Sequence, residues 1–191
     1  RAARNPLLVH LSADATPAHS EYLKALVDPL KDETAAASFG RDLPRPRALP
    51  SQARDLETWF PTDEDVDPAV RFSNANACVR RNVWERFPFD ESPLGVEDIK
   101  WARQVLQAGY DILYAREATV FHTHSASLRD VFRTARRQRA SLMNLNASEW
   151  SLSTIAALRF WIGFSVLDTV FAASRGYPLW QWLHPWGYRA A

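Results

Sequence analysis

The chain is poor in the residues that give the simplest clues to function. It holds one cysteine, Cys78, and six glycines in 191 residues, and its net charge is +1. A single cysteine excludes an internal disulfide framework and fits a reducing compartment. The near-zero net charge gives no overall field that would attract nucleic acid, so we expect no nucleic-acid partner. So few glycines, with no phosphate-cradling glycine loop, disfavour an enzyme that holds nucleotides or phosphates in such a loop.

What the chain does contain is typical of a globular domain. Hydrophobic residues make up 47% and charged residues 24% of it, and the length allows one domain with a real core. The sequence starts at Arg1 and enters a strand-like run at residues 7–11 almost at once. Because a strand needs neighbours, we expect this chain to be a piece of a longer protein.

Strand-like and helix-like segments alternate, which predicts an α/β fold. The predicted strands are 7–11, 35–39, 72–79, 112–114 and 119–122. The first predicted helix begins at Pro17. Further helices are predicted at 52–59, 80–87, 96–108, 128–145 and 153–173. Most of residues 42–70 form a proline-rich and largely irregular excursion, of the kind that is often functional or mobile.

Asp14 is the first candidate for a functional carboxylate. It lies in the turn after the 7–11 strand, and ligands of open α/β sheets collect outside the carboxyl ends of strands. A carboxylate there can hold Mg²⁺ or Mn²⁺ together with substrate phosphates and water. The alternative is an ordinary turn or helix-cap residue, because Asp is favoured in both places.

Glu97 and Asp98 open the predicted 96–108 helix. Acids are favoured in a first helical turn by the helix dipole, which is the structural alternative. Neighbours on a helix point about 100° apart, so the two carboxylates cannot face one target equally. Asp98 borders the apolar stripe of the helix, whereas Glu97 lies over Lys100 and Trp101. Asp98 is therefore the better candidate for a partly desolvated general base.

His122 and His124 lie two residues apart at the end of a predicted strand. In an extended strand both side chains point to one face, although their splay favours one metal contact over two. A hydrogen-bonded structural role is the alternative for either histidine. Zinc is disfavoured, because there is one cysteine and no further spaced histidine pair.

A basic block lies in the predicted 128–145 helix and comprises Arg129, Arg133, Arg136, Arg137 and Arg139. A solvated helix face is the common explanation for such a run. The functional alternative is an anchor for a diphosphate or for an anionic lipid surface.

Taken in order, several of these pieces resemble the family 2 glycosyltransferases, especially their bacterial rhamnosyltransferase-like branch. The matching segments are residues 8–17, 40–44, 72–81, 95–98, 108–110 and 120–124. The resemblance implies a GT-A fold, which is a partial Rossmann-like mixed sheet flanked by helices. It also implies a nucleotide-diphosphate sugar donor and a divalent metal, Mg or Mn.

The resemblance also implies roles for individual residues. Asp14 falls in the metal-binding aspartate motif, with Ser12 in place of its first acid, and His122 at a position that completes the metal or diphosphate site. Asp98 falls at the general base, with Glu97 beside it. Expected to line the donor and acceptor pocket are Gly40, Arg41, Asn74, Asn76 and Trp101.

The expected division of the chain follows from the same resemblance. Residues 1–125 would be a partial GT-A catalytic domain that lacks the N-terminal nucleotide-binding half, and 126–191 a helical extension rich in Arg and Trp. We therefore expect this chain alone to be inactive. The expected activity of the whole enzyme is inverting transfer of a hexosyl or rhamnosyl group to a glycan or lipid-linked acceptor in cell-envelope polysaccharide biosynthesis. The alternative is a non-catalytic remnant that binds glycan or membrane.

The end of the chain predicts contact with a membrane surface. Residues 155–172 are largely apolar, but Arg159 and Asp168 interrupt them, which favours a buried or interfacial helix over a spanning one. The Trp-rich segment 178–186 fits a membrane–water interface, or it covers core surface or a subunit contact. We expect a cytoplasmic peripheral protein at the inner face of the cytoplasmic membrane.

Overall fold

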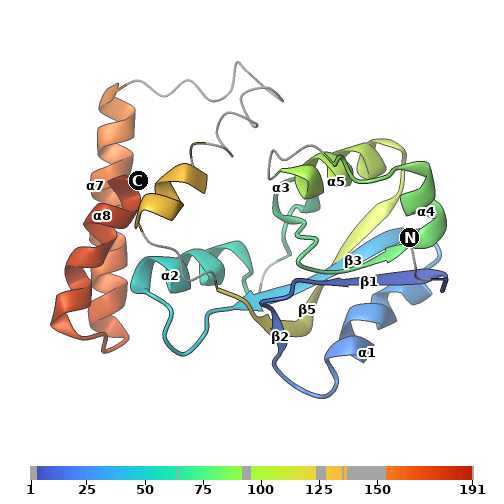
Figure 1. Cartoon of the computed structure of the whole chain (residues 1–191), viewed down its shortest axis with the longest axis horizontal. Helices are drawn as coiled ribbons and strands as arrows, with labels where there is room; N and C mark the ends of the chain where they lie inside the picture. Colours follow the sequence, from blue (N-terminus) through green and yellow to red (C-terminus); the bar gives the residue numbers. More distant parts are fainter. Residues whose placement is uncertain are drawn as a thin grey trace. The chain divides into compact units, whose positions relative to one another are not determined.

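A computed structural model of the chain describes residues 4–63, 65–91, 96–123, 128–134, 136 and 154–190. The chain divides into two compact units (Figure 1). The first combines Arg1–Arg45, Leu56–Pro93 and Glu97–Thr123, and the second combines Pro46–Asp55, Leu94–Val96 and His124–Ala191.

The first unit is built on one mixed sheet of five strands. These are β1 (Leu7–Leu11), β2 (Thr16–Pro17), β3 (Ala35–Leu43), β4 (Asn76–Arg80) and β5 (Asp111–Phe121), in the order β1-β4-β3-β5-β2. β3 and β5 are parallel, and every other neighbouring pair is antiparallel. The predicted α/β class with a GT-A-like mixed sheet is thus confirmed.

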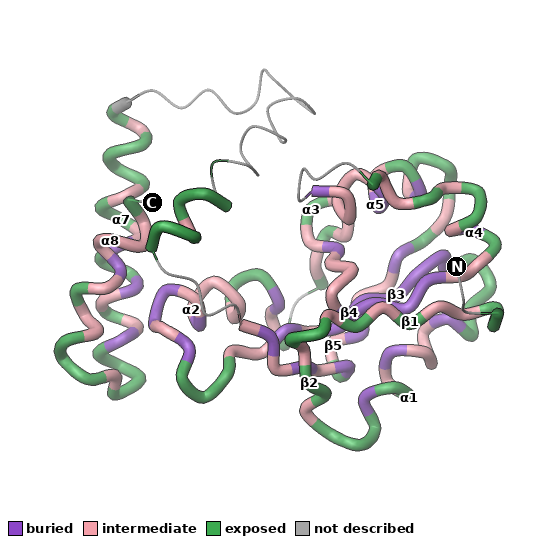
Figure 2. Tube along the Cα trace, in the orientation of Figure 1, coloured by how far each residue is buried: buried purple, intermediate pink, exposed green. Residues whose placement is uncertain are grey.

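Helices cover both faces of this sheet. One face packs on α1 (Tyr22–Val27) and the 3₁₀ turn η1 (Asp28–Lys31). The other packs on α3 (Pro68–Arg71), α4 (Arg81–Arg86) and α5 (Glu97–Gln107). Side chains alternate along a strand, so Cys78 joins the first core while its neighbours Ala77 and Val79 join the second. Figure 2 shows the resulting band of buried residues along the central strands.

Several predicted element boundaries were wrong. Thr16 and Pro17 do not start a helix but pair with Phe121 and Val120 as a short edge strand, where proline is tolerated because its missing N–H faces away from the ladder. β4 begins at Asn76 instead of residue 72. The predicted strands 112–114 and 119–122 are one strand, β5, whose register against β3 shifts between Gly40 and Arg41.

The second unit is helical within the described residues. It contains the first part of α2 (Pro50–Trp59), a helical segment at 128–134, α7 (Thr154–Ser174), the 3₁₀ turn η2 (Leu179–Leu183) and α8 (His184–Ala190). The predicted 153–173 helix is confirmed by α7. Most of the remainder of the predicted 128–145 helix lies outside the described residues.

Candidate active site

Strand direction brings the candidate residues to one edge of the sheet. β1 and β3 are each antiparallel to β4, and β3 is parallel to β5, so β1, β3 and β5 all run the same way. Their carboxyl ends therefore share an edge, which is where ligands of such sheets bind. Asp14 follows β1, Asp42 is the penultimate residue of β3, and His122 follows β5.

At this edge His122 lies between two carboxylates. Its Nδ1 is 2.8 Å from Oδ2 of Asp42, and its Nε2 is 3.3 Å from Oδ1 of Asp14. The backbone N–H of His122 donates to the carbonyl of Leu43 at 3.0 Å, which holds the residue against the end of β3. The hydrogen bond to Asp42 raises the pKa of His122 above its ordinary value, against the opposing effect of burial.

The two sides of the imidazole differ in their surroundings. Asp42 is 4% exposed, whereas 46% of the Asp14 side chain is exposed. A buried carboxylate on one ring nitrogen fixes the orientation of a histidine and directs its other nitrogen outward. His122 therefore directs Nε2, which is itself buried, toward Asp14.

Asp14 and His122 fit the first ligands of a divalent metal. Adjacent ligands of a six-coordinate Mg²⁺ or Mn²⁺ lie about 3 Å apart, given metal–oxygen distances of about 2.1 Å, which matches the 3.3 Å between Oδ1 of Asp14 and Nε2 of His122. Ser12 Oγ donates to Asp14 Oδ1 at 2.5 Å and orients that carboxylate. No set of three or more His, Cys, Asp or Glu side chains in the described part of the chain is placed to hold a metal. A metal here would need further ligands from substrate phosphates and water.

Asp98 lies in the first turn of α5 and is perturbed by its surroundings. Desolvation by burial raises its pKa to about 6, and the nearby charge of Glu97 acts in the same direction. Backbone N–H groups of Ile99 and Asn74 donate to its carboxylate and oppose that rise. A carboxylate with a pKa near 6 can accept a proton close to neutral pH, as a general base must.

One turn of the backbone connects Asp98 with the edge that holds Asp14. The N–H of Asn74 donates to Asp98, and the carbonyl of the next residue, Ala75, accepts the N–H of Ser12 at 2.9 Å. Ser12 in turn donates to Asp14. The predicted base and the predicted metal ligand are therefore held by adjacent residues of the same turn.

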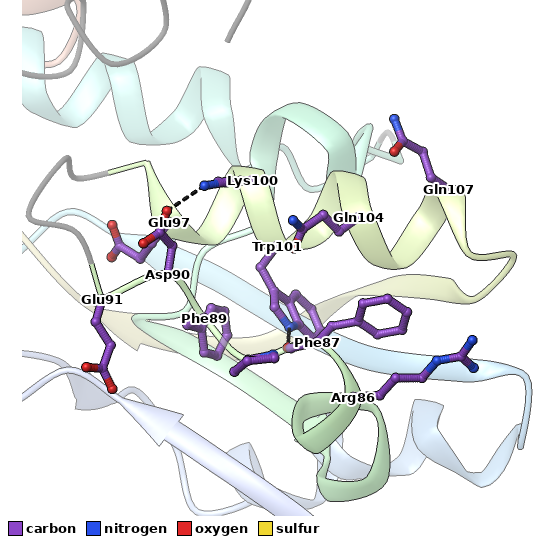
Figure 3. A pocket seen from close by; sticks show the side chains of 11 residues that line it. Arg86, Phe87, Phe89, Asp90, Glu91, Glu97, Lys100, Trp101, Gln104 and Gln107 are labelled. Atoms are coloured by element: carbon purple, nitrogen blue, oxygen red, sulfur yellow. Dashed lines mark hydrogen bonds and ion pairs between the residues drawn. The ribbon is translucent and has the colours of Figure 1, made fainter. Parts of the chain in front are cut away.

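Glu97 faces a different region from Asp98. It lines an open groove of about 660 Å³ between α5 and residues 86–91. Figure 3 shows Glu97, Lys100 and Gln104 on the α5 side of the groove and Phe89 on the other. Lys100 Nζ lies 2.5 Å from Oδ2 of Asp90. Neither Asp98 nor Asp14 is among the residues that line this groove. The structure therefore places Glu97 and Asp98 in different surroundings, as the helix geometry predicted.

Two residues predicted to line a pocket are instead part of the packed interior. Asn76 is fully buried, and its amide accepts from Tyr22 Oη at 3.0 Å and donates to the carbonyl of Ala118 at 3.1 Å. A Cβ at position 40 would clash with that same carbonyl and with the Asn76 amide. Gly40 and Asn76 thus allow β3, β4 and β5 to approach closely. Both are buried, so the structure gives them a packing role, and the ligand-lining role stays a prediction that it does not support.

Trp101 and Arg41 also make internal contacts. Trp101 is 1% exposed, and its indole N–H donates to the carbonyl of Phe87 at 2.6 Å. Its ring packs against Phe72 and Phe89, with 5.1 Å between centroids in both cases, so it forms the floor of the groove and mainly stabilises the core. Arg41 Nε donates to the carbonyl of Phe60 at 3.0 Å.

Two residues of the edge were missed by the sequence reasoning. Asp42 and Arg45 both flank the proline of the 40–44 segment. Arg45 is exposed, and its guanidinium donates to the backbone carbonyl of Asp14 while its own N–H donates to Thr123 Oγ1 at 2.9 Å. The sequence signal available for Asp42 and Arg45 was a polar residue near the end of a predicted strand. His124 and Gly95 lie outside the described residues.

Two relatives of this chain are named as rhamnosyltransferases. Over 137 residues it is 33% identical to the O-antigen chain rhamnosyltransferase RfbN of Salmonella typhimurium, an alignment that covers 66% of this chain and 44% of that protein. Over 142 residues it is 32% identical to the O-antigen chain rhamnosyltransferase WbaN of Salmonella anatum, covering 69% of this chain and 45% of the relative.

The matched region accounts for less than half the length of either relative. No protein-family model matches the chain. The similarity supports a glycosyltransferase.

Proposed function

We propose that this chain forms the catalytic and acceptor-side part of an inverting glycosyltransferase of family 2. The donor would be a nucleotide-diphosphate rhamnose or other hexose, and the acceptor a hydroxyl of a glycan or lipid-linked glycan of a cell-envelope polysaccharide. The observation that carries the proposal is the turn at Asn74 and Ala75, which holds Asp98 on one side and the Ser12–Asp14 segment on the other. The names of the two relatives support the rhamnosyl donor and the glycan acceptor.

Asp98 is the proposed general base. Above its pKa of about 6 the carboxylate is ionised and can take the proton of an acceptor hydroxyl as that oxygen attacks the anomeric carbon. Backbone N–H donors from Ile99 and Asn74 orient the carboxylate without supplying a cation that would suppress its basicity. A single displacement needs no covalent nucleophile and inverts the anomeric configuration.

Asp14 and His122 are the proposed ligands of the divalent metal. Such an ion, when bound, would offset the negative charge that develops on the departing nucleoside diphosphate. Asp42 holds the His122 ring so that Nε2 faces Asp14. Arg45, whose guanidinium lies against the backbone of Asp14, adds an exposed cation beside the position of the diphosphate.

The test replaces one acid at a time in the complete product of the gene that encodes this chain. Transfer from a nucleotide-activated rhamnose to a glycan acceptor is followed by product formation, and the anomeric configuration of the product by NMR. The substitution Asp98→Asn is expected to lower turnover by roughly 10²- to 10⁴-fold while leaving metal-dependent donor binding intact, and the matched substitution Glu97→Gln to retain turnover. If Asp98→Asn retains full turnover, or if the native protein binds glycan without any transfer, the proposal is wrong and a non-catalytic binding role replaces it.

A further inference from the structure

The second unit contains a helix whose polarity is inverted relative to that of a helix on a water-soluble domain. On α7, Ser165, Asp168 and Ala172 are buried against the rest of the unit. Apolar residues of α7 that remain accessible, here called the α7 outer face, include Leu158, Ile162, Val166 and Val170, and each is between 42% and 60% exposed. Apart from Arg159, which is exposed, the accessible side chains of α7 are thus mostly apolar while Ser165 and Asp168 are buried, which differs from the usual pattern of a surface helix.

The exposed surface of α7 is long and mostly apolar, with the exposed Arg159 within it. The segment Ile155–Ser174 is the one helix among the described residues that is long and apolar enough to cross a membrane, and 17% of its most apolar window is buried. Figure 2 shows exposed residues along most of α7. Beyond it, η2 exposes Leu179, Trp180 and Leu183, each more than 70% accessible. Soluble monomers rarely expose an apolar surface of this extent.

A charged cluster holds the inner side of α7. Asp168 has no exposed surface, and its two oxygens lie 2.7 Å from Arg54 and 2.7 Å from Arg189. Arg189 also contacts Asp55 at 2.6 Å. The guanidinium groups of Arg54 and Arg189 each lie 5.3 Å from the ring centroid of Phe164. Residues of α2 and α8 thus attach to α7 along its inner side.

This cluster decides how α7 can meet a bilayer. If α7 crossed the hydrocarbon, Arg54, Asp55 and Arg189 would have to enter it together with Asp168. Charged side chains in the hydrocarbon are costly. A helix that keeps one side attached to charged groups of the protein can instead lie in the interface plane and place its other side in lipid. The geometry therefore fits contact through the α7 outer face alone, with the inner face directed to the protein.

The charge of the unit is complementary to an anionic surface. Arg129, Arg133 and Arg136 are exposed and occur at the i, i+4, i+7 spacing of one helix face. The first of the described residues of that helix, Leu128, packs within van der Waals reach of Gly187 on α8. Basic side chains near an anionic leaflet each favour binding, and an exposed Trp180 suits the headgroup region.

We propose that the second unit binds an anionic phospholipid surface, with α7 lying in the plane of the bilayer and its outer face in contact with the acyl chains. This role goes beyond glycosyl transfer and does not depend on it, because membrane binding requires no substrate. The occupant of the apolar face is lipid, not a second copy of the chain.

The experiment measures flotation of the 191-residue chain with vesicles of phosphatidylcholine alone or with a minor share of phosphatidylglycerol. The chain is expected to float with the anionic vesicles. The quadruple variant Leu158→Gln, Ile162→Gln, Val166→Gln, Val170→Gln should lower the partition coefficient by about tenfold or more, since it removes the apolar contact. The variant Arg129→Gln, Arg133→Gln, Arg136→Gln should lower it by about tenfold and remove the preference for phosphatidylglycerol.

The matched control replaces four apolar side chains of similar exposure in the first unit, Val9, Leu11, Leu23 and Val70, which are 41% to 53% exposed. This control should float like the wild-type chain, and circular dichroism checks the helix content of all variants. A chain that stays in solution with both vesicle types, or a control that loses binding equally, overturns the proposal.

Two further measurements test whether a second copy of the chain covers the α7 outer face and whether α7 spans the bilayer. If sedimentation velocity shows a dimer that the α7 variant dissociates, and the wild-type chain does not float, the outer face is a subunit contact and the proposal is wrong. An alkaline carbonate wash should release the chain from vesicles. Resistance to that wash would overturn the in-plane orientation, since a spanning helix is retained.

Discussion

Asp98 in the first unit and Asp168 in the second are both carboxylates removed from water, and the two units treat them in opposite ways. Asp98 receives backbone N–H groups and lies near another acid, and burial raises its pKa to about 6. Burial also opposes the ionisation of Asp168, but hydrogen bonds from Arg189 and Arg54 outweigh it and hold its pKa below the ordinary value. The first environment leaves an acid that can exchange a proton near neutral pH, and the second leaves one that stays charged and joins helices.

The two units place their polar and apolar groups in opposite ways. In the first, helices cover both faces of the sheet and the polar groups that remain open gather at one edge. In the second, the charged groups are paired inside and the apolar groups are outside. Perturbed carboxylates are typical of functional sites, but ion-pair networks perturb them too, so the direction of the pKa and the partners together separate the two cases.

The largest expected effect comes from removing the proposed proton acceptor, Asp98. The substitution Asp98→Asn should reduce transfer by the complete gene product by roughly 10²- to 10⁴-fold, the usual contribution of a general base. The rate is measured over a range of acceptor concentrations at saturating donor, which gives both the turnover number and the Michaelis constant. A loss confined to the Michaelis constant of the acceptor would indicate a binding role for Asp98 instead.

Removing the carboxylate of Asp168 should lower the stability of the chain. Replacing Asp168 with Ala leaves Arg54 and Arg189 without their buried partner, and loss of one partner of a buried pair typically costs about 3–5 kcal/mol. Urea unfolding followed by tryptophan fluorescence reports this change, because Trp161, Trp182 and Trp186 all lie in the second unit. The control Asp28→Ala removes an acid from exposed pairs with Lys24 and Lys31 and should leave the unfolding midpoint unchanged.

The histidine at the sheet edge gives a smaller and more specific effect. The substitution Asp42→Asn weakens the hydrogen bond that orients His122, and loss of such an outer partner typically lowers metal affinity by about 10- to 100-fold. Titration of Mn²⁺ by calorimetry measures the affinity, and NMR of the His122 ring reports its tautomer. The control Asp111→Asn, at the distant start of β5, should change neither. Unchanged metal affinity with an altered tautomer would show that His122 does not bind the metal.

The smallest expected effect is the pH dependence of stability. Because the pKa of Asp98 is raised from 3.8 to about 6 in the folded chain, the folded state holds its proton more tightly than the unfolded state. The ionised carboxylate therefore costs stability, on the order of 2 kcal/mol for a partly accessible group. This cost is absent below about pH 4, grows as the pH rises to about 6 and is constant above that.

Asp98→Asn should remove this cost and raise the free energy of unfolding at neutral pH, with no gain in acid. Urea unfolding at several pH values measures the difference. A variant that is equally destabilised at every pH would mean that Asp98 stabilises the fold as a helix cap and that its pKa is not raised in the folded chain.

Periodicity and turn chemistry were enough to predict the α/β class and the positions of most helices. They made Asp14, Asp98 and His122 candidates, and the family resemblance supplied the roles predicted for them. The 3.6-residue repeat of α5 was sufficient to separate Glu97 from Asp98, because neighbouring side chains on a helix diverge. The apolar run of α7 was likewise visible in the sequence.

Only the tertiary structure decided which residues meet. Asp42 and His122 are 80 positions apart and come together because β3 and β5 are parallel neighbours. Asn76 and Gly40 proved to be interior residues, because the close approach of three strands depends on contacts that no local pattern encodes. Asp168 interrupts an apolar run in the sequence, and its two arginines arrive from positions 54 and 189. Local sequence sets backbone preference and the polarity of each face, whereas the pKa of a carboxylate depends on distant groups that folding brings beside it.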